Sequence, residues 1–417
     1  MSIPLKLITT GSFQRYDCTG CGVCCKGRFA ITISKADRDR IVAQKWTDEE
    51  LDLGGAKLFT KHGDEFVIAH RANGACAFLQ DDGLCRIHAR YGIAAKPTAC
   101  RLYPFRLIPA GRQVRVDVRY DCPATAGNDG QPVDGHRREL LSLLKLLTPD
   151  QAAELPAPTL FGATSLSWRA LVLITESYER LLLDISLPIT KRLAACINLT
   201  SLLRDRRIAK VADGDFDDFV RALESTVQMA AVEDPIVRRT PLPMEALVFR
   251  HVLGVHGRID RVGEKASLVG RFGASMNLLG GRGMVPRLYE GFPDVSFRDI
   301  EAFRYEPSGD TSLTIERYLH THLISMGFFG AGYYGDGYLD GLNALLLTYP
   351  LLLWFARAFA GSEGASTLSP ANIERALMVV DHQRGQTPLM NTGSERALAR
   401  YLGDRNVLRS LAIWYGS

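Results

Sequence analysis

Four cysteines stand within eight residues near the N-terminus: Cys18, Cys21, Cys24 and Cys25. Thiolates separated by two residues can converge on one metal centre, because a tight turn points successive sulfurs inward. Gly20 and Gly22 supply the flexible backbone that such a turn requires. We therefore expect this loop to form one wall of a metal or iron–sulfur site.

Four further cysteines follow before residue 123: Cys76, Cys85, Cys100 and Cys122. The ninth, Cys196, stands alone in the later part of the chain. The first ten residues contain no long apolar core and no small-residue cleavage site, so we expect a cytoplasmic protein. Thiols stay reduced in that compartment, which favours metal binding over a disulfide framework.

The identity of the metal depends on which thiols act together. Cys18, Cys21 and Cys24, with Cys122 followed by a proline, have the ligand spacing of bacterial ferredoxins and would hold a 4Fe–4S cluster. Cys25 makes the assignment ambiguous, because either member of the Cys24–Cys25 pair can ligate. The spacing favours iron–sulfur over zinc. The Cys-x3-Cys-x2-Cys spacing of radical enzymes that use S-adenosylmethionine is absent from this loop.

The remaining thiols offer a zinc site as an alternative. Cys76, Cys85 and Cys100 remain, and His88 follows Cys85 at Cys-x2-His spacing, so these side chains could complete a tetrahedral zinc site or share ligation with the first loop. Asp82-Gly83 predicts a hairpin turn that would place Cys76 and Cys85 at opposed strand ends.

Basic and aromatic side chains flank Cys100. Arg101, Tyr103 and Arg106 could neutralise a thiolate-rich site or hold the carboxylate of a cofactor, and a solvated basic face is the alternative.

Acid–base candidates occur later in the chain. They are the pair His320 and His322, and Asp381 with His382. Surface or packing roles are favoured for these side chains.

The spacing of apolar residues predicts a small α+β domain followed by a larger, mostly α-helical domain. Residues 1–15 are expected to be a lead-in. The N-terminal part predicts strands at residues 29–34, 65–70 and 113–119 and helices at residues 35–44 and 85–91. A hydrophilic, turn-rich stretch suggests a boundary that separates domains 1–130 and 131–417. Helices are predicted beyond it at residues 136–147, 166–187, 190–203, 216–232, 244–255, 312–326, 342–359, 371–382 and 394–401, with a further helix start at residues 148–151.

The composition of the 417 residues, 46% hydrophobic and 23% charged, is that of soluble globular proteins. The net charge is +4, and residues 1–130 alone carry 19 Lys and Arg against 14 Asp and Glu. This excess suits an anionic cofactor or an acidic partner and is too small to indicate nucleic-acid binding. Residues 342–359 form the most apolar run, but Pro350 and Arg357 favour a buried core helix over a membrane span.

The cysteine spacing resembles a known family. The pattern comprises Cys18-x2-Cys21-Gly-x-Cys24-Cys25, Cys76-x-Phe-Leu, Gly83-x-Cys85-x-Ile-His88 and Lys96-Pro-x-x-Cys100-Arg-x-Tyr-Pro-Phe105. It is similar to the CxxCxxCC cysteine-cluster family, which is described as zinc- or iron-chelating. Members usually have Arg-Pro where this chain has Lys96-Pro97, a change that keeps the charge.

The best-described relatives in that family are the flagellin lysine N-methylases, which are associated with a 4Fe–4S cluster and S-adenosylmethionine. The resemblance therefore implies an enzyme that methylates lysine in a protein substrate, without assigning a catalytic base. Two alternatives remain open, a non-catalytic metal-binding module and an iron–sulfur redox protein. The oligomeric state and the methyl acceptor are not assigned by the sequence.

Overall fold

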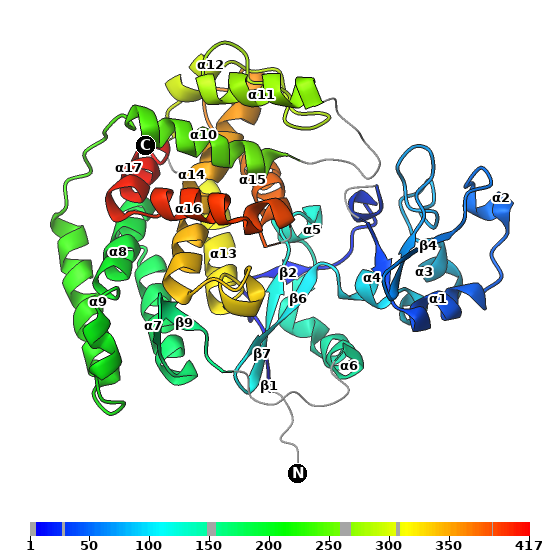
Figure 1. The fold of residues 1–417 in the computed structure, drawn as a ribbon, viewed down its shortest axis with the longest axis horizontal. Helices are drawn as coiled ribbons and strands as arrows, with labels where there is room; N and C mark the ends of the chain where they lie inside the picture. Colours follow the sequence, from blue (N-terminus) through cyan, green and yellow to red (C-terminus); the bar gives the residue numbers. More distant parts are fainter. Residues whose placement is uncertain (1–5, 27–29, 148–155, 259–267, 306–308, 386) are drawn as a thin grey trace.

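The computed structural model describes residues 6–26, 30–147, 156–258, 268–305, 309–385 and 387–417. A large helical body lies beside a smaller lobe formed by residues near the N-terminus (Figure 1). Of the described residues, 55% are helical and 10% are in strands, which confirms the predicted α+β class. The predicted helix start at residues 148–151 lies outside the described residues.

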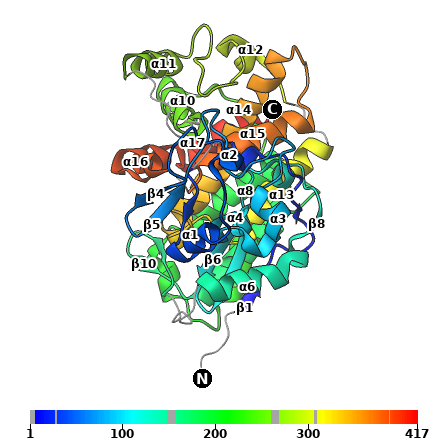
Figure 2. The same cartoon turned by 90° about the vertical axis from the view of Figure 1, so that its right-hand side faces the viewer.

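The small lobe, which we define as residues 30–103, contains an antiparallel sheet and short helices. Strand β5 (Glu65–Ile68) lies between β3 (Thr32–Ile33) and β4 (Phe59–His62). The start of the predicted strand at residues 29–34 lies outside the described residues. The helices are α1 (Lys35–Val42), α2 (Asp48–Leu51), α3 (Arg86–Tyr91) and α4 (Thr98–Leu102). Figure 2 shows β4, β5 and α1 in front of the helical body.

The lobe has a hydrophobic cluster of its own. Ile33, Ile41, Ile68, Phe78 and Ile87 are among its buried members. The helix α1 begins where the sequence predicts, because the side chain of Ser34 accepts a hydrogen bond from the Asp37 backbone N–H and so caps the helix. The cysteines of the lobe lie at the edge of this cluster, since Cys76 belongs to it and Cys25, Cys85 and Cys100 pack against it.

A second sheet lies between the lobe and the helical body. Strand β7 (Gln113–Val118) pairs antiparallel with β6 (Phe105–Ala110) and parallel with β1 (Lys6–Ile8). A separate short pair joins β2 (Arg15–Tyr16) to β8 (Gln131–Pro132). The expectation that residues 1–15 are a lead-in is therefore wrong, because strands within them pair with residues about a hundred positions later.

The helical body is built from twelve helices within the described residues. They are α6 (Arg137–Leu147), α7 (Trp168–Leu182), α8 (Ile189–Leu202), α9 (Phe216–Glu233), α10 (Pro243–Gly257), α11 (Leu268–Gly280), α12 (Phe297–Ala302), α13 (Gly309–Ile324), α14 (Tyr338–Ser362), α15 (Pro370–Gln383), α16 (Gly393–Leu402) and α17 (Arg405–Tyr415). Helix α14 is long and apolar enough to cross a membrane, yet 89% of its most apolar window is buried in the protein. The prediction of a buried core helix is confirmed.

One large hydrophobic cluster joins the β1–β7–β6 sheet to these helices. Val114, Val116 and Val118 of β7 share it with Leu319 of α13 and Leu352 of α14. The predicted domain boundary at residue 130 stays a prediction. The packing places β1, β6 and β7 with the helical body, whereas the separate hydrophobic cluster is confined to the small lobe.

Candidate metal centre

All eight cysteines near the N-terminus are free thiols that line two adjoining cavities. The first, which we call the outer cavity, measures 260 Å³ and is lined by Cys18, Cys21, Cys24, Cys25, Cys85, Cys100 and Cys122. The second, the inner cavity, measures 200 Å³ and is lined by Cys24, Cys25, Cys76, Cys85 and Cys100. Residues separated by about a hundred positions therefore contribute sulfur to one region. Cys196 is buried in α8 within the large hydrophobic cluster of the helical body.

The backbone of residues 18–25 turns sharply at two glycines. Gly20 and Gly22 adopt φ values of 69° and 67°, in the left-handed region that favours glycine. A short 3-10 helix, Val23–Cys25, follows and places the sulfurs of Cys24 and Cys25 3.8 Å apart. The sequence therefore predicted the turn correctly from its glycines.

The turn at Gly83 packs directly against this loop. A Cβ atom at Gly83 would lie 2.1 Å from the carbonyl oxygen of Gly20, so only glycine fits there. Nearby, the backbone N–H of Cys76 donates to the carbonyl of Cys25 over 2.6 Å. These contacts place the two halves of the cysteine system next to each other.

The predicted hairpin arrangement of Cys76 and Cys85 is wrong in one respect. A turn does form at Asp82-Gly83, where the Gly83 N–H donates to Gln80. However, Cys85 forms a β-bridge with Leu79 and Cys76 forms one with His70. The two cysteines therefore do not oppose each other, because the segment between them folds into a second turn.

The surroundings of Cys24, Cys76 and Cys122 raise the pKa of these thiols and so favour their protonated form when no cation is bound. Burial raises the pKa of Cys76 and of Cys122 to about 11, and the proximity of Cys24 adds to both shifts. The pKa of Cys24 is raised first by its hydrogen bond with Cys25 and then by burial. Cys24 therefore interacts with Cys25, Cys76 and Cys122. Metal binding would have to release the protons of the thiols that become ligands.

The donor set fits a thiolate-bound metal in kind and in number. Sulfur ligands select zinc and iron–sulfur clusters. Of the two cavities, Cys18, Cys21 and Cys122 line only the outer one and Cys76 only the inner one, whereas four cysteines line both: Cys24, Cys25, Cys85 and Cys100. Among the described residues, no three His, Cys, Asp or Glu side chains stand close enough together to hold a metal ion. Binding therefore requires the sulfurs to move toward one another.

Of the other predicted site residues, three line the cysteine cavities and one does not. His88 is an exposed residue of α3 that lines the outer cavity. Arg101 lines the same cavity and donates to Glu139 over 2.6 Å, while Tyr103 lines both cavities. Arg106 is not among the lining residues of either cavity; it donates to Asp117 and to the carbonyl of Gly332.

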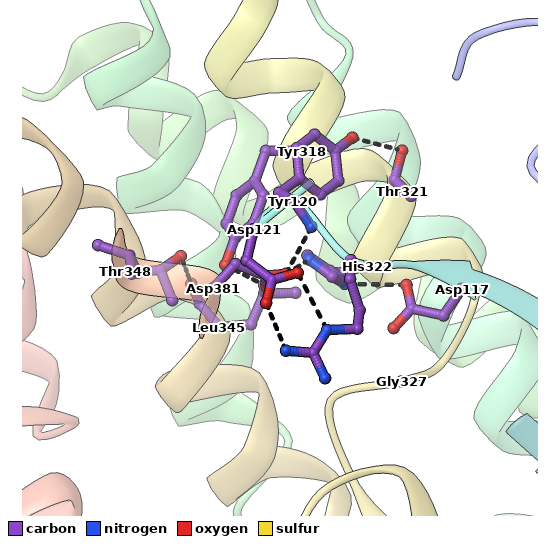
Figure 3. Close-up of polar contacts among 12 residues, drawn as sticks. Asp117, Tyr120, Asp121, Tyr318, Thr321, His322, Gly327, Leu345, Thr348 and Asp381 are labelled. Carbon is purple, nitrogen blue, oxygen red and sulfur yellow. Dashed lines mark hydrogen bonds and ion pairs between the residues drawn. The ribbon is translucent and has the colours of Figure 1, made fainter. Parts of the chain in front are cut away.

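A buried polar network anchors the segment that carries Cys122 (Figure 3). Asp121, directly before Cys122, accepts hydrogen bonds from Arg119 and from the hydroxyl of Tyr103 over 3.1 Å. Its second oxygen lies 3.1 Å from Nδ1 of His382 in α15. The position of Cys122 is therefore tied both to the wall of the cavities and to the helical body.

The same network continues through His322 of α13, which lies between two carboxylates. Its Nδ1 is 2.9 Å from Asp117 and its Nε2 is 3.2 Å from Asp381. Asp381 also accepts the backbone N–H of Tyr120 over 2.7 Å. Burial alone would raise the pKa of Asp117, but His322 lowers it to about 2 with help from Arg106.

Sequence reasoning found part of this network. His322, Asp381 and His382 were candidates, and their burial agrees with the favoured packing role. Asp117 and Asp121 were missed. The available signal was an acidic residue in the apolar strand that ends at Val118 and another directly before Cys122, since a buried carboxylate requires a partner.

Residues 17–123 match the CxxCxxCC family model, whose description reads "Putative zinc- or iron-chelating domain". No curated protein and no solved structure matches the chain. The predicted resemblance to the CxxCxxCC family is confirmed for these residues, which include all eight cysteines of the two cavities. The similarity to flagellin lysine N-methylases stays a prediction.

Proposed function

We propose that this chain holds an iron–sulfur cluster and acts as an S-adenosylmethionine-dependent protein lysine N-methyltransferase in the cytoplasm. The premise is the CxxCxxCC domain at residues 17–123. The observation that carries the cluster is the outer cavity, which is lined by seven thiols from residues 18 to 122. The methyltransferase activity rests on the resemblance to flagellin lysine N-methylases.

The ligand assignment follows the two cavities. Cys18, Cys21 and Cys122 would hold the cluster, with Cys24 or Cys25 as the fourth ligand. The other member of that pair would join Cys76 of the inner cavity with Cys85 and Cys100, which line both cavities. His88 is exposed and lines only the outer of these two cavities, so we leave it out of this second set. A 4Fe–4S cluster supplies one-electron redox chemistry and a rigid cross-link between distant parts of the chain.

The residues beside the thiols would position a cofactor and keep its site rigid. Arg101 lines the outer cavity and carries a guanidinium group suited to a carboxylate such as that of S-adenosylmethionine. Tyr103 is held by its hydrogen bond to Asp121. A lysine amine must lose its proton before it attacks a methyl group, so the enzyme also needs a base, which we leave unassigned.

The test is to purify the chain without oxygen and measure S-adenosylmethionine binding together with transfer of labelled methyl groups to proteins of a cell lysate. We expect saturable binding and labelled lysine. The Arg101→Gln variant should bind S-adenosylmethionine less tightly while keeping its metal, and Arg221→Gln, at an exposed ion pair on α9, serves as a matched control. The proposal fails if the metal-loaded protein neither binds S-adenosylmethionine nor methylates any protein.

A non-catalytic zinc module is the second candidate, and the inner cavity favours it. Cys76 is buried and burial raises the pKa of Cys100, so a bound zinc ion would stabilise thiolates that burial alone disfavours. Structural zinc contributes on the order of 10 kcal/mol to folding. Stoichiometric zinc in a colourless protein, with a stability unchanged by iron chelators, would favour this function over the first.

A further inference from the structure

A further cavity, separate from the outer and inner cavities, lies in the helical body. It measures 290 Å³ and is bounded by α8, α10, the loop before α14, the start of α14, and α16. Its described lining residues include no cysteine. The volume is at the small end of the range of about 300–1,000 Å³ for ligand pockets, which suits a small molecule rather than a peptide.

The base of this cavity presents an unused hydrogen-bond acceptor. Asn343 of α14 lines the cavity and is only 8% exposed. Its Nδ2 donates to the carbonyl of Gly403 over 2.8 Å, which fixes the orientation of the amide. Its Oδ1 is buried and receives no hydrogen bond from the described parts of the chain. A buried acceptor without a donor is costly, so a bound N–H group would stabilise it.

The negative charge of a carboxylate in the cavity lining is only partly balanced by nearby cations. Asp336 lines the cavity, and its closest cation is Nη1 of Arg396 at 3.3 Å. Burial raises the pKa of Asp336; Arg396 and Arg400 oppose the shift and Asp340 adds to it. Asp340 is itself paired with Arg204 over 2.7 Å. Asp336 and the Asn343 oxygen together favour a ligand that carries an ammonium group.

The cavity lining also carries an exposed cation that can bind an anion. Arg400 of α16 lines the cavity and is exposed, and it forms no hydrogen bond or ion pair with the residues that the structure describes. Arg405 also lines the cavity and donates to the amide oxygen of Asn198 over 2.8 Å. A guanidinium group in this position matches the planar geometry of a carboxylate.

The lining also has an apolar part, beside further polar side chains such as Thr200 and Ser201. Ile197, Val252, Val255, Ala344 and Met390 contribute to it. These side chains can accommodate an aliphatic group but offer no hydrogen bonds to a polar one.

We propose that this cavity binds a small aliphatic α-amino acid, with its ammonium group at Asn343 and Asp336 and its carboxylate at Arg400. The inference goes beyond the proposed function, because it uses no residue of the cysteine cavities and does not require methyl transfer. It assigns the helical body a ligand-binding role of its own.

The test is calorimetric titration of the full-length, metal-loaded chain with L-leucine, L-valine and L-methionine. Isopentylamine and 4-methylpentanoate, which keep the carbon skeleton of leucine but lack the carboxylate and the ammonium group respectively, are titrated in parallel. At least one amino acid should bind, and the two analogues should bind at least about tenfold more weakly, since each of them loses the charge-assisted hydrogen bonds of one ionic group.

Two variants locate the site. Arg400→Gln changes an exposed side chain and should weaken binding about tenfold without affecting folding, whereas Arg221→Gln, outside the cavity, should not. Asn343→Leu removes the buried acceptor and should also weaken binding, provided that its thermal unfolding matches wild type. The proposal is overturned if none of the three amino acids binds at about 10 mM, if either analogue binds as well as the amino acids, or if Arg400→Gln and Arg221→Gln bind alike.

Discussion

At the residue scale, the adjacent thiols Cys24 and Cys25 have a special position. Both residues line the outer and inner cavities, as Cys85 and Cys100 also do, but Cys24 and Cys25 are neighbours in the chain and their sulfurs are 3.8 Å apart. Cys18 and Cys21, in contrast, line only the outer one of these two cavities. The pair can therefore exchange roles as a ligand, while Cys18 and Cys21 cannot be replaced by a neighbour.

This difference predicts unequal losses of metal. Cys24→Ser and Cys25→Ser should each retain more iron per chain than Cys18→Ser, because the remaining thiol can complete the ligand set of the outer cavity. The double variant should lose as much as Cys18→Ser or more. Iron and zinc are counted by mass spectrometry, with Cys196→Ser as the control for a buried thiol outside the site. Equal losses in Cys18→Ser, Cys24→Ser and Cys25→Ser would contradict the shared role.

The contact between Asp117 and His322 predicts a loss of stability in acid. The pKa of Asp117 is lowered to about 2, so its contribution is complete above the unfolded-state pKa near 4 and is lost as the pH falls toward 2. The contribution is on the order of 2 kcal/mol. The free energy of unfolding, measured with urea between pH 7 and pH 2, should therefore decrease below pH 4, and Asp117→Asn should make this decrease smaller. At pH 7 the variant should be less stable than the wild type by about 3–5 kcal/mol.

Asp205 provides the matched control. Its pKa is also lowered to about 2, by its hydrogen bonds with Arg207, but both side chains are solvent-exposed. Solvent screens such pairs, so Asp205→Asn should leave the pH dependence almost unchanged. If Asp117→Asn and Asp205→Asn changed the pH dependence of unfolding equally, the burial of the Asp117–His322 pair would not explain the loss of stability in acid.

At the scale of elements, the turn at Gly83 joins the two halves of the cysteine system. Gly83 has φ of 84° and a Cβ at this position would collide with the Gly20 carbonyl. Gly63, in the turn between β4 and β5, has φ of 60° but open space around it. Substitutions at the two glycines therefore distinguish the free-energy cost of a left-handed backbone from the cost of disturbing a packed contact.

Gly83→Ala should consequently lower metal content and stability more than Gly63→Ala. Gly63→Ala should cost only the left-handed conformation, about 1–2 kcal/mol. Gly83→Ala adds a backbone collision and moves Cys85 away from residues 18–25. Metal per chain and the midpoint of thermal unfolding measure both effects. Full metal content in Gly83→Ala would show that the packing of this turn is not needed for the site.

Much of the secondary structure could be predicted from local pattern. The helices α14 and α15 and strand β7 lie close to their predicted ranges, because apolar spacing and capping residues are local signals. Strand β1 was missed, since three residues that pair in parallel with a strand over a hundred positions later leave no local signal. The cysteines identified the site, but their partition between two cavities depends on tertiary packing, as does the network around Asp121.

At the scale of the whole molecule, two hydrophobic clusters of very different size share one chain. The small lobe has a limited core of its own, and the cysteines lie at its edge. The helical body shares its larger core with β1, β6 and β7. A small domain with a limited core commonly depends on a metal for stability, whereas a large core does not.

Metal removal should therefore unfold the lobe and leave the helical body folded. Hydrogen exchange after chelation should show loss of protection at residues 30–103, while α14 keeps its protection. The metal-loaded protein is the reference for every segment. Uniform loss of protection along the chain, or none in the lobe, would contradict this division.

The central claim, that the cysteines of residues 18–122 hold an iron–sulfur cluster, is tested most directly by metal analysis of protein purified without oxygen. The measurement combines iron, sulfide and zinc counts per chain with absorption and Mössbauer spectra. We predict a brown protein with iron and sulfide in equal, cluster-sized amounts, and their loss in Cys122→Ser. A colourless, folded protein with zinc alone, or with no metal, would contradict the claim.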